Sequence, residues 1–278
     1  MKPMMSPERF FTLFLEELKG LPELFHYYKF LSSEKDFEFR KSYFIQRLDY
    51  ISRQVMAFRG SGTEQPAIWD CGCGYGTTCL YLAMNGLASY GSTLEFYFPF
   101  IEKRKQWWAA HGDSSLFTAG YEDIFDRHPK PDSVDIIIVQ DTLHHLEPID
   151  EALGVFHATL KKNGILIGIE ENGSNIIQNL KLYKQRGNQR IITYWDDTLK
   201  KKITMGNENI RSLEHWTRLF AEQQLKIDAD RTEFIRVLPP HVYGTKKAEE
   251  MAAKEQSWKS SLLRKYFYFG INFTARKS

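Results

Sequence analysis

The sequence has 278 residues, of which 42% are hydrophobic and 26% are charged, and its formal net charge is +2. These values are typical of a globular chain of one or two domains, and the charge gives no support to nucleic-acid binding. No apolar run approaches the ~20 residues of a membrane-spanning helix, and Glu8 and Arg9 interrupt the start of the chain, so we expect a cytoplasmic protein without stable membrane insertion.

Residues 1–62 are expected to form a helical region. Ser6 and a following proline open a helix that runs to about Gly20, and further helices are predicted after Pro22 and over residues 36–58. Most of the aromatic side chains in these helices suit a packed core. The region is also suited to act as a lid over a ligand site, and the two roles are compatible.

A short apolar strand ending in Asp70 is followed by three glycines at alternate positions, Gly72, Gly74 and Gly76, and then by a helix that begins at Thr77. Glycine allows a sharp turn and a close approach of a ligand to the backbone, and the helix start offers free N–H groups. The spacing G-x-G-x-G differs from the dinucleotide fingerprint G-x-G-x-x-G, and no P-loop lysine follows. The unit therefore predicts a nucleotide-like ligand of another kind.

The three cysteines, Cys71, Cys73 and Cys79, all lie in or just after this glycine loop. Their spacing, C-x-C-x5-C, matches no standard zinc motif. We expect reduced, packed side chains and no metal.

The second strand is expected to end at an acid, Glu95, about 20 residues after the glycine loop, where a carboxylate can accept hydrogen bonds from both ribose hydroxyls. A third short strand follows near residue 117. The run 134–140 is a continuous apolar strand of the buried, parallel kind, and Asp141-Thr142-Leu143-His144-His145-Leu146 follows it. A helix over 150–161 and a strand over 165–170 complete an alternation that predicts a doubly wound parallel sheet.

Residues 171–209 are polar and loosely patterned, and we interpret them as a substrate cap inserted after the fifth strand. A helix over 210–224 and a strand within 225–237 come next. The aromatic end of the chain, residues 266–277, suits either a membrane-surface anchor or a last antiparallel strand, and its length favours the strand.

The motifs between about residues 67 and 170 resemble class I S-adenosylmethionine (SAM) dependent methyltransferases of the small-molecule type, similar to types 11 and 25. That resemblance implies an α/β fold, a Rossmann-like, doubly wound and mostly parallel seven-stranded sheet. The last antiparallel strand would then lie between the two preceding ones. The SAM-binding domain would occupy residues 63–278, with the cap at about 171–209.

The resemblance also implies which residues bind the cofactor, whose product is S-adenosylhomocysteine. The glycine loop would hold the methionine part, Glu95 the ribose, and Gln140 with Asp141 the sulfonium end. The family usually carries an aspartate where Tyr121 stands, which leaves open whether Tyr121, Glu122 or Asp123 contacts the adenine. The full expected set is Asp70, Gly72, Cys73, Gly74, Gly76, Thr77, Glu95, Phe96, Tyr121, Glu122, Asp123, Gln140 and Asp141.

The predicted reaction is methyl transfer to a small, apolar or aromatic acceptor at oxygen or carbon. An oxygen acceptor must lose a proton, and histidine suits that task, so His144 and His145 are the candidate bases, with His145 favoured. The alternative for both is a packing role beneath the cofactor loop.

Four other interpretations stay open at this point. They are an NAD(P)-binding oxidoreductase, a non-catalytic SAM-binding module, a membrane-peripheral lipid methyltransferase, and a catechol-type enzyme with magnesium held near Asp141, Glu171 and Asn172. A homodimer is also open, because nothing in the sequence decides the oligomeric state.

Overall fold

The structure is a computed structural model that describes residues 4–30, 34–95, 98–243 and 248–277. Its elements are α1 (Pro7–Gly20), α2 (Pro22–Tyr28), α3 (Glu34–Arg59), β1 (Ile68–Cys71), α4 (Thr77–Met84), β2 (Ser89–Thr93), α5 (Phe100–Trp108), η1 (Ser114–Leu116), β3 (Phe117–Tyr121), β4 (Val134–Gln140), η2 (Leu143–His145), α6 (Ile149–Thr159), β5 (Leu160–Glu171), α7 (Ile176–Arg186), β6 (Ile191–Asp196), β7 (Lys201–Gly206), α8 (Leu213–Glu222), β8 (Leu225–Ile227), η3 (Ala229–Arg231), β9 (Glu233–Ile235), α9 (Pro240–Tyr243), α10 (Ala248–Ser257), α11 (Ser261–Phe267) and β10 (Gly270–Lys277).

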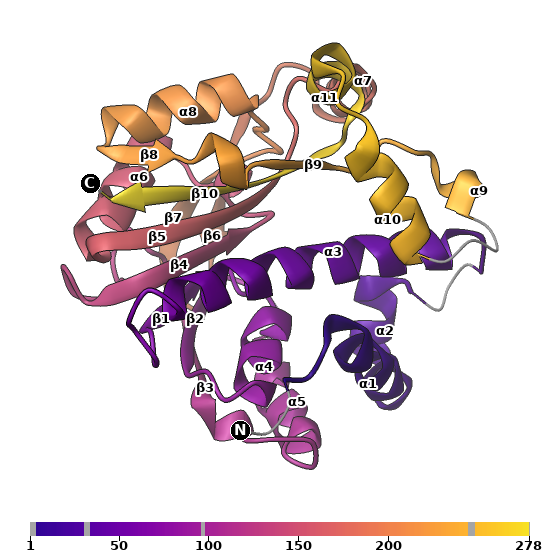
Figure 1. The fold of residues 1–278 in the computed structure, drawn as a ribbon. Coiled ribbons are helices and arrows are strands. Elements are labelled where there is room, and N and C mark those ends of the chain that lie inside the picture. The colour runs from indigo at the N-terminus through magenta and orange to yellow at the C-terminus, as the bar shows by residue number, and fades with distance from the viewer. Residues whose placement is uncertain (1–3, 31–33, 96–97, 244–247, 278) are drawn as a thin grey trace.

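A central sheet has the strand order β3-β2-β1-β4-β5-β10-β8, and β9 also pairs with β10 (Figure 1). Strands β1 to β5 are parallel, whereas β10 runs antiparallel to β5, β8 and β9. The predicted α/β fold and the predicted last antiparallel strand are confirmed. The described sheet has eight strands where seven were expected, because two short strands, β8 and β9, share the edge beside β10.

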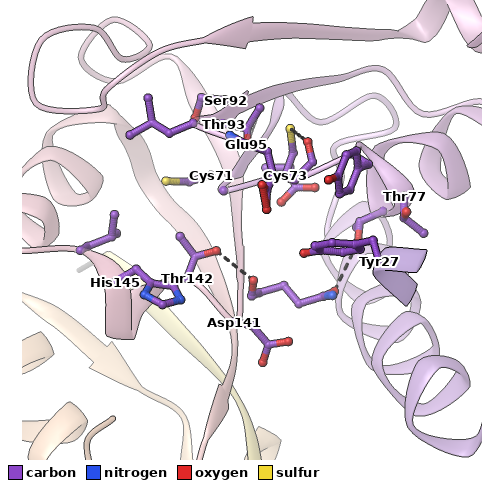
Figure 2. A pocket seen from close by; sticks show the side chains of 18 of the residues that line it. Tyr27, Cys71, Cys73, Thr77, Ser92, Thr93, Glu95, Asp141, Thr142 and His145 are labelled. Carbon is purple, nitrogen blue, oxygen red and sulfur yellow. Dashed lines mark hydrogen bonds between the residues drawn. The ribbon is translucent and has the colours of Figure 1, made fainter. Parts of the chain in front are cut away.

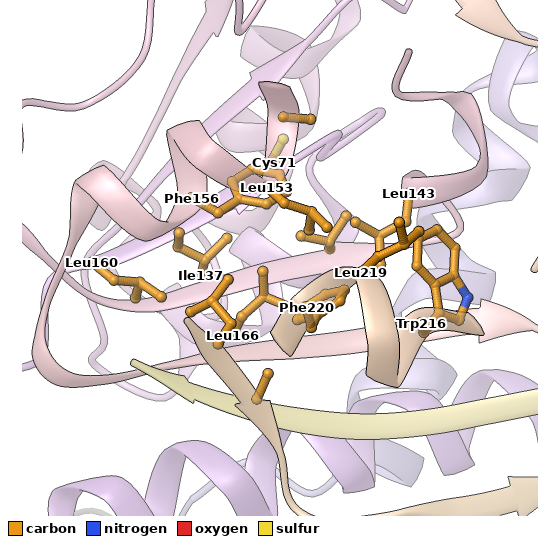
Figure 3. Close-up of a cluster of buried hydrophobic side chains, with 14 of the residues drawn as sticks. Cys71, Ile137, Leu143, Leu153, Phe156, Leu160, Leu166, Trp216, Leu219 and Phe220 are labelled. Atoms are coloured by element: carbon orange, nitrogen blue, oxygen red, sulfur yellow. The ribbon is translucent and has the colours of Figure 1, made fainter. Parts of the chain in front are cut away.

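Side chains of β4 alternate between two hydrophobic layers, as a strand that is buried on both faces requires. Ile136 and Ile138 pack with α3, whose Tyr50, Ile51 and Val55 belong to the same cluster. Ile137 and Val139 face the opposite layer, formed mainly by α6 and α8 and including Phe156, Trp216 and Phe220 (Figure 3). The sheet is therefore covered on both sides, and its strand ends are left to build a site.

The N-terminal helices pack onto α4 and α5 through aromatic side chains. Ser6 caps α1 by accepting from the backbone N–H of Arg9 at 3.2 Å, as predicted from the Ser-Pro start. Phe10 stacks on Trp108 with ring centroids 4.4 Å apart. Glu17 and Arg104 form a fully buried, two-point ion pair at 2.7 and 2.8 Å. The first helix is thus fixed to the body of the protein, and a domain boundary at residue 62 stays a prediction.

The segment between β5 and α8 contains a helix, α7, and a separate antiparallel hairpin, β6–β7. The Tyr121 hydroxyl donates to Asp196 at 2.6 Å, and the Lys201 ammonium lies 2.7 Å from Asp123, so β3 and the loop after it hold the hairpin in place. Within the described part of the chain, no helix is both long enough and apolar enough to span a bilayer.

Candidate active site

A cavity of about 830 Å³ lies at the carboxyl ends of β1, β2 and β4, which is where ligands bind in doubly wound sheets (Figure 2). One side is formed by the glycine loop, by residues 92–95 and 122–125, and by the end of β4. The other side comes from α2, α3, the β6–β7 hairpin and Arg236. The N-terminal helices and the 171–209 segment therefore both contribute to its walls.

The glycine loop gives the cavity a floor of backbone. Gly72 has φ +79°, and a Cβ on it would lie 2.2 Å from the Thr142 hydroxyl oxygen, so a side chain there is excluded. Gly74 has φ +54°, and a Cβ on it would meet no described atom within 4 Å. Since Gly74 lines the cavity, a side chain at this position would occupy ligand space.

Asp70 is the next-to-last residue of β1 and lines the cavity beside the glycine loop. Asp70 is buried, and burial raises the pKa of its carboxyl to about 7. A hydrogen bond from the Cys79 thiol partly offsets this rise. Cys71, Cys73 and Cys79 are free and buried. Thr77, at the start of α4, also lines the cavity, and its hydroxyl is hydrogen-bonded to Tyr28 at 2.7 Å and to Arg104 at 2.8 Å.

Glu95 lies in the cavity wall beyond the end of β2 (Figure 2). Its backbone N–H donates to the Thr93 hydroxyl at 3.0 Å, which fixes the turn that follows the strand. The strand ends at Thr93, two residues earlier than expected, and Glu95 lines the same cavity as the glycine loop. Its contact with a ribose stays a prediction. Phe96 lies outside the described residues.

The three adenine candidates are placed differently. Glu122 and Asp123 line the cavity, but Tyr121 is not among its described lining residues, since its hydroxyl is turned to Asp196. Glu122 accepts from the Tyr90 hydroxyl and pairs with Arg127, and Asp123 pairs with Lys201. Which of the three contacts an adenine stays open, and the geometry favours the two acids.

Gln140 ends β4, Asp141 directly follows it, and both line the cavity. Gln140 accepts from the Thr78 hydroxyl at 3.3 Å. Asp141 has φ +48° and forms an ion pair with Arg47 of α3, which brings together residues 94 positions apart in the sequence. The second carboxylate oxygen of Asp141 is buried and has no hydrogen-bond partner among the described residues.

His144 and His145 have different surroundings. His144 is buried and does not line the described cavity, and its Nδ1 lies 2.5 Å from Glu170. Burial alone would lower the pKa of His144, but the Glu170 carboxylate outweighs that effect and raises it to about 9. His144 is therefore protonated at neutral pH, which does not suit a base.

His145 lines the cavity (Figure 2). Its Nδ1 lies 2.9 Å from the Gly206 carbonyl oxygen and must donate the proton, because a carbonyl oxygen only accepts. In the neutral ring Nε2 is then the basic nitrogen. Glu208 approaches both rings, 3.7 Å from His144 Nε2 and 4.0 Å from His145 Nε2.

The residues of the catechol-type alternative are not arranged for a shared metal. The Asn172 amide donates to the backbone carbonyls of residues 264, 265 and 268, and its oxygen accepts from the Ser174 N–H. Glu171 accepts from Gln178 at 2.5 Å. Asn172 therefore connects β5 to the α11–β10 turn.

Sequence reasoning missed three charged residues of this region: Arg47, Arg104 and Glu170. Arg104 donates to the Tyr75 carbonyl at 2.7 Å as well as to Glu17 and Thr77, and Glu170 accepts the N–H groups of residues 142 and 143. Each of these contacts joins segments that are distant in sequence. The one local signal is the charge itself, because Arg104 stands among the aromatic residues of a short helix.

Comparisons with known proteins agree with the fold. Residues 69–166 match a family model described as a methyltransferase domain. No curated protein matches the chain. The structure is similar to magnesium protoporphyrin IX methyltransferase from Synechocystis PCC 6803 with bound S-adenosylhomocysteine, at 14% identity and a TM-score of 0.56, covering 96% of this chain and 100% of that one.

It is also similar to geranyl diphosphate C-methyltransferase from Streptomyces coelicolor A3(2), at 13% identity and a TM-score of 0.55, covering 87% of this chain and 84% of that one. At such identities the likeness concerns the fold, whereas the family model concerns the sequence. Residues 69–166 are therefore similar in sequence to a methyltransferase domain, and the chain has the fold of the class I SAM-dependent methyltransferases.

Proposed function

We propose that this protein transfers a methyl group from SAM to a small-molecule acceptor, apolar or aromatic in part, at oxygen or carbon. The observation that carries the proposal is that one cavity joins the glycine floor to a wall of aromatic side chains, with Asp141 and His145 between them. Two ligands can then meet within a single volume, as a bimolecular transfer requires.

The residues on the glycine side fit SAM. Gly74 leaves open space over the floor, and Glu95 offers a carboxylate for ribose hydroxyls. Glu122 and Asp123 line the cavity and are the proposed adenine contacts, and Asp70 lines it beside the glycine loop. When bound, SAM supplies an electrophilic methyl group on a cationic sulfonium. The Asp141 carboxylate pairs with Arg47 through one oxygen, and its other oxygen, which has no hydrogen-bond partner among the described residues, is the proposed contact of the sulfonium.

The opposite wall suits an aromatic or apolar acceptor. Tyr27, Phe39, Tyr43 and Phe44 line it, and all come from α2 and α3. These helices and the β6–β7 hairpin enclose the acceptor end in the manner of a lid and a cap, which reduces access of water.

His145 is the proposed base for an oxygen acceptor. The Gly206 carbonyl fixes the ring and leaves Nε2 to take the proton. His144 then acts as a positioning residue through its contact with Glu170. A carbon acceptor also has to lose a proton, and the same nitrogen is available for it.

The test is calorimetric titration of the wild-type protein with S-adenosylhomocysteine, NAD and NADP. We expect binding of S-adenosylhomocysteine alone. Binding of NAD or NADP without it would overturn the proposal in favour of an oxidoreductase. A second assay, release of S-adenosylhomocysteine from SAM in the presence of a panel of phenols and enols, separates an enzyme from a non-catalytic module.

A further inference from the structure

The acceptor end of the cavity contains three arginines. Arg40 and Arg47 lie on one face of α3, with Tyr43 between them at helical spacing, and Arg236 directly follows β9. In the sheet, four strands (β1, β4, β5 and β10) separate β2, which ends two residues before Glu95, from β9. Arg236 and the ribose acid therefore follow well-separated strands of the sheet, whereas Arg47 lies on α3 and pairs with Asp141 after β4.

Tyr43 brings two of these charges together. The guanidinium carbons of Arg47 and Arg236 lie 3.7 and 3.9 Å from the centre of its ring. Burial raises the pKa of Tyr43 to about 12, so its hydroxyl is neutral and does not offset the positive charge. The Nε atoms of all three arginines are buried and have no hydrogen-bond partner in the described residues.

Acidic groups only partly balance this end. Asp141 pairs with Arg47, and Glu171 stands 4.0 Å from Arg236. Arg40 forms no ion pair with any residue that the structure describes. At the guanidinium groups themselves, three positive charges meet two carboxylates, while a third acid, the buried Glu255, accepts the backbone N–H of Arg236. The Arg40 guanidinium is left without a charged partner among the described residues at a half-buried site, where ionic interactions are stronger than in open water.

We propose that this end of the cavity is an anion subsite that binds a carboxylate or phosphate group of the acceptor. The guanidinium fork matches both anions, and an anion held there directs the remainder of the acceptor toward Asp141 and His145. That the bound anion is part of the methyl acceptor rests on the proposed function, whereas the anion subsite itself does not depend on it.

The test is calorimetry on protein saturated with S-adenosylhomocysteine, using 4-hydroxybenzoate, 4-hydroxybenzamide, phenyl phosphate and inorganic phosphate as probes. We expect an anion to bind at least about tenfold more tightly than the neutral amide and to weaken as salt is raised. Arg40→Gln and Arg236→Gln should each weaken it about tenfold, and Arg40→Lys less. Arg53→Gln is the control, because Arg53 is on the same helix but pairs outside the cavity with Asp49 and Glu233.

Equal binding of the acid and the amide, no binding of any anion, or unchanged binding in both glutamine variants would overturn the subsite. Thermal melting of each variant separates loss of the site from loss of the fold. Whichever of 4-hydroxybenzoate and phenyl phosphate binds more tightly shows whether the subsite prefers a carboxylate or a phosphate. If S-adenosylhomocysteine fails to bind while anion binding still depends on Arg40, the proposed function fails and the subsite stands.

A different surface carries a second inference. Helix α7 exposes four large apolar side chains at helical spacing, and α11, which lies beside it in Figure 1, exposes two more. We call this the apolar face, and its members are Ile176, Ile177, Leu180, Tyr183, Leu262 and Phe267. They are 45–68% exposed. Such a contiguous apolar surface is unusual on a protein facing only water.

The two chain segments that carry the apolar face contain charges of one sign, and the acid Glu214 of α8 pairs with Lys265 of α11. Residues 172–195 contain no aspartate or glutamate, and residues 256–278 contain none either. Lys181 and Lys184 of α7 are exposed beside the apolar stripe, as are Arg190 and Lys259. An apolar stripe flanked by bases is the pattern of a helix that lies on an anionic bilayer without crossing it.

We infer that the apolar face binds the surface of an anionic lipid bilayer. The test is sedimentation of the full chain with vesicles of phosphatidylcholine alone or mixed with phosphatidylglycerol. We expect binding to the mixed vesicles, loss in high salt, and at least about tenfold weaker binding for the double variant Ile177→Glu with Leu180→Glu. Met56→Glu, at an exposed apolar side chain on α3, is the control.

No binding to the mixed vesicles, or equal binding by the double variant, would overturn this inference. Light scattering tests whether a second copy of the chain covers the apolar face instead. A stable dimer that the double variant abolishes would assign the apolar face to a second copy of the chain.

Discussion

Arg104 illustrates how one buried charge holds several segments of this protein together. Its guanidinium donates to Glu17 of α1, to the Tyr75 carbonyl of the glycine loop and to Thr77 at the start of α4. Neither Arg104 nor Glu17 has solvent exposure, so each depends on the other for charge compensation. The pair fixes the N-terminal helices and the glycine loop relative to each other.

We predict that Glu17→Gln lowers the free energy of unfolding by about 3–5 kcal/mol, because Arg104 would keep its charge without a buried partner. Urea unfolding followed by circular dichroism measures the change. Glu16→Gln is the control, since Glu16 is the exposed neighbour and should change stability by less than about 0.5 kcal/mol. Equal stabilities of the two variants would contradict the role given to the pair.

Glu95 is the residue on which cofactor binding should depend most directly. Glu95→Ala should weaken S-adenosylhomocysteine at least about tenfold, because two charge-assisted hydrogen bonds to the ribose would be lost. Calorimetry gives the affinity. The matched variant Glu102→Ala, at an exposed acid of α5, should bind as the wild type does. An unchanged affinity in Glu95→Ala would remove Glu95 from the site.

His145→Ala should reduce turnover by about 10²–10⁴-fold with an oxygen acceptor, while the affinity for S-adenosylhomocysteine changes less than about twofold. The physical reason is that the variant lacks the nitrogen that takes the acceptor proton. Steady-state kinetics with the best acceptor from the panel provides the comparison, and His241→Ala, at an exposed position, is the control. Wild-type turnover in His145→Ala would reject His145 as the base.

At the scale of elements, the short helix η2 is held to β5 by Glu170. One carboxylate oxygen accepts the backbone N–H groups of Thr142 and Leu143, at 2.9 and 2.7 Å, and the other contacts His144. Three consecutive residues after β4 are thereby fixed by a single side chain. This arrangement sets the position of His145 at the cavity.

The His144–Glu170 pair predicts a pH dependence of stability. The pKa of His144 is about 9 in the folded protein and about 6.5 in the unfolded chain, so its contribution is complete below about pH 6.5 and is lost as the pH rises through 9. The free energy of unfolding should fall by an amount of the order of 1–3 kcal/mol over this window. Urea titrations at several pH values measure it. The His144→Gln variant should show a flatter profile, and an equally steep profile would assign the dependence to other groups.

At the scale of the whole molecule, the sequence predicts the strands of the core better than the segments that form the walls of the cavity. The apolar run 134–140 coincides with β4, and the last strand was expected where β10 lies, because both are read from local hydrophobic patterns. The β6–β7 hairpin was not predicted, because its strands are mostly exposed and lack clear alternation. It is held instead by side chains such as Tyr121 and Lys201.

The candidate site divides in the same way. Asp70, the glycines and Glu95 were predicted because they follow strands at fixed spacing, and β1 and β2 bring them to one edge of the sheet. The Arg47–Asp141 pair and the approach of Arg236 to Tyr43 could not be predicted, since they join α3 to the loops after β4 and β9 across long sequence separations. Only packing of α3 against the sheet creates these contacts.

The two sides of the cavity come from separate stretches of the chain, and this has a consequence for protein engineering. The side assigned to SAM is encoded within residues 70–141, whereas the opposite wall is encoded by α2, α3, the hairpin and Arg236. Mutant libraries confined to the residues of the opposite wall can change which acceptor is used, while the residues proposed to bind SAM stay unchanged. On the proposed assignment, the residues open to change for new acceptors are therefore separated in the primary structure from the residues that bind the methyl donor.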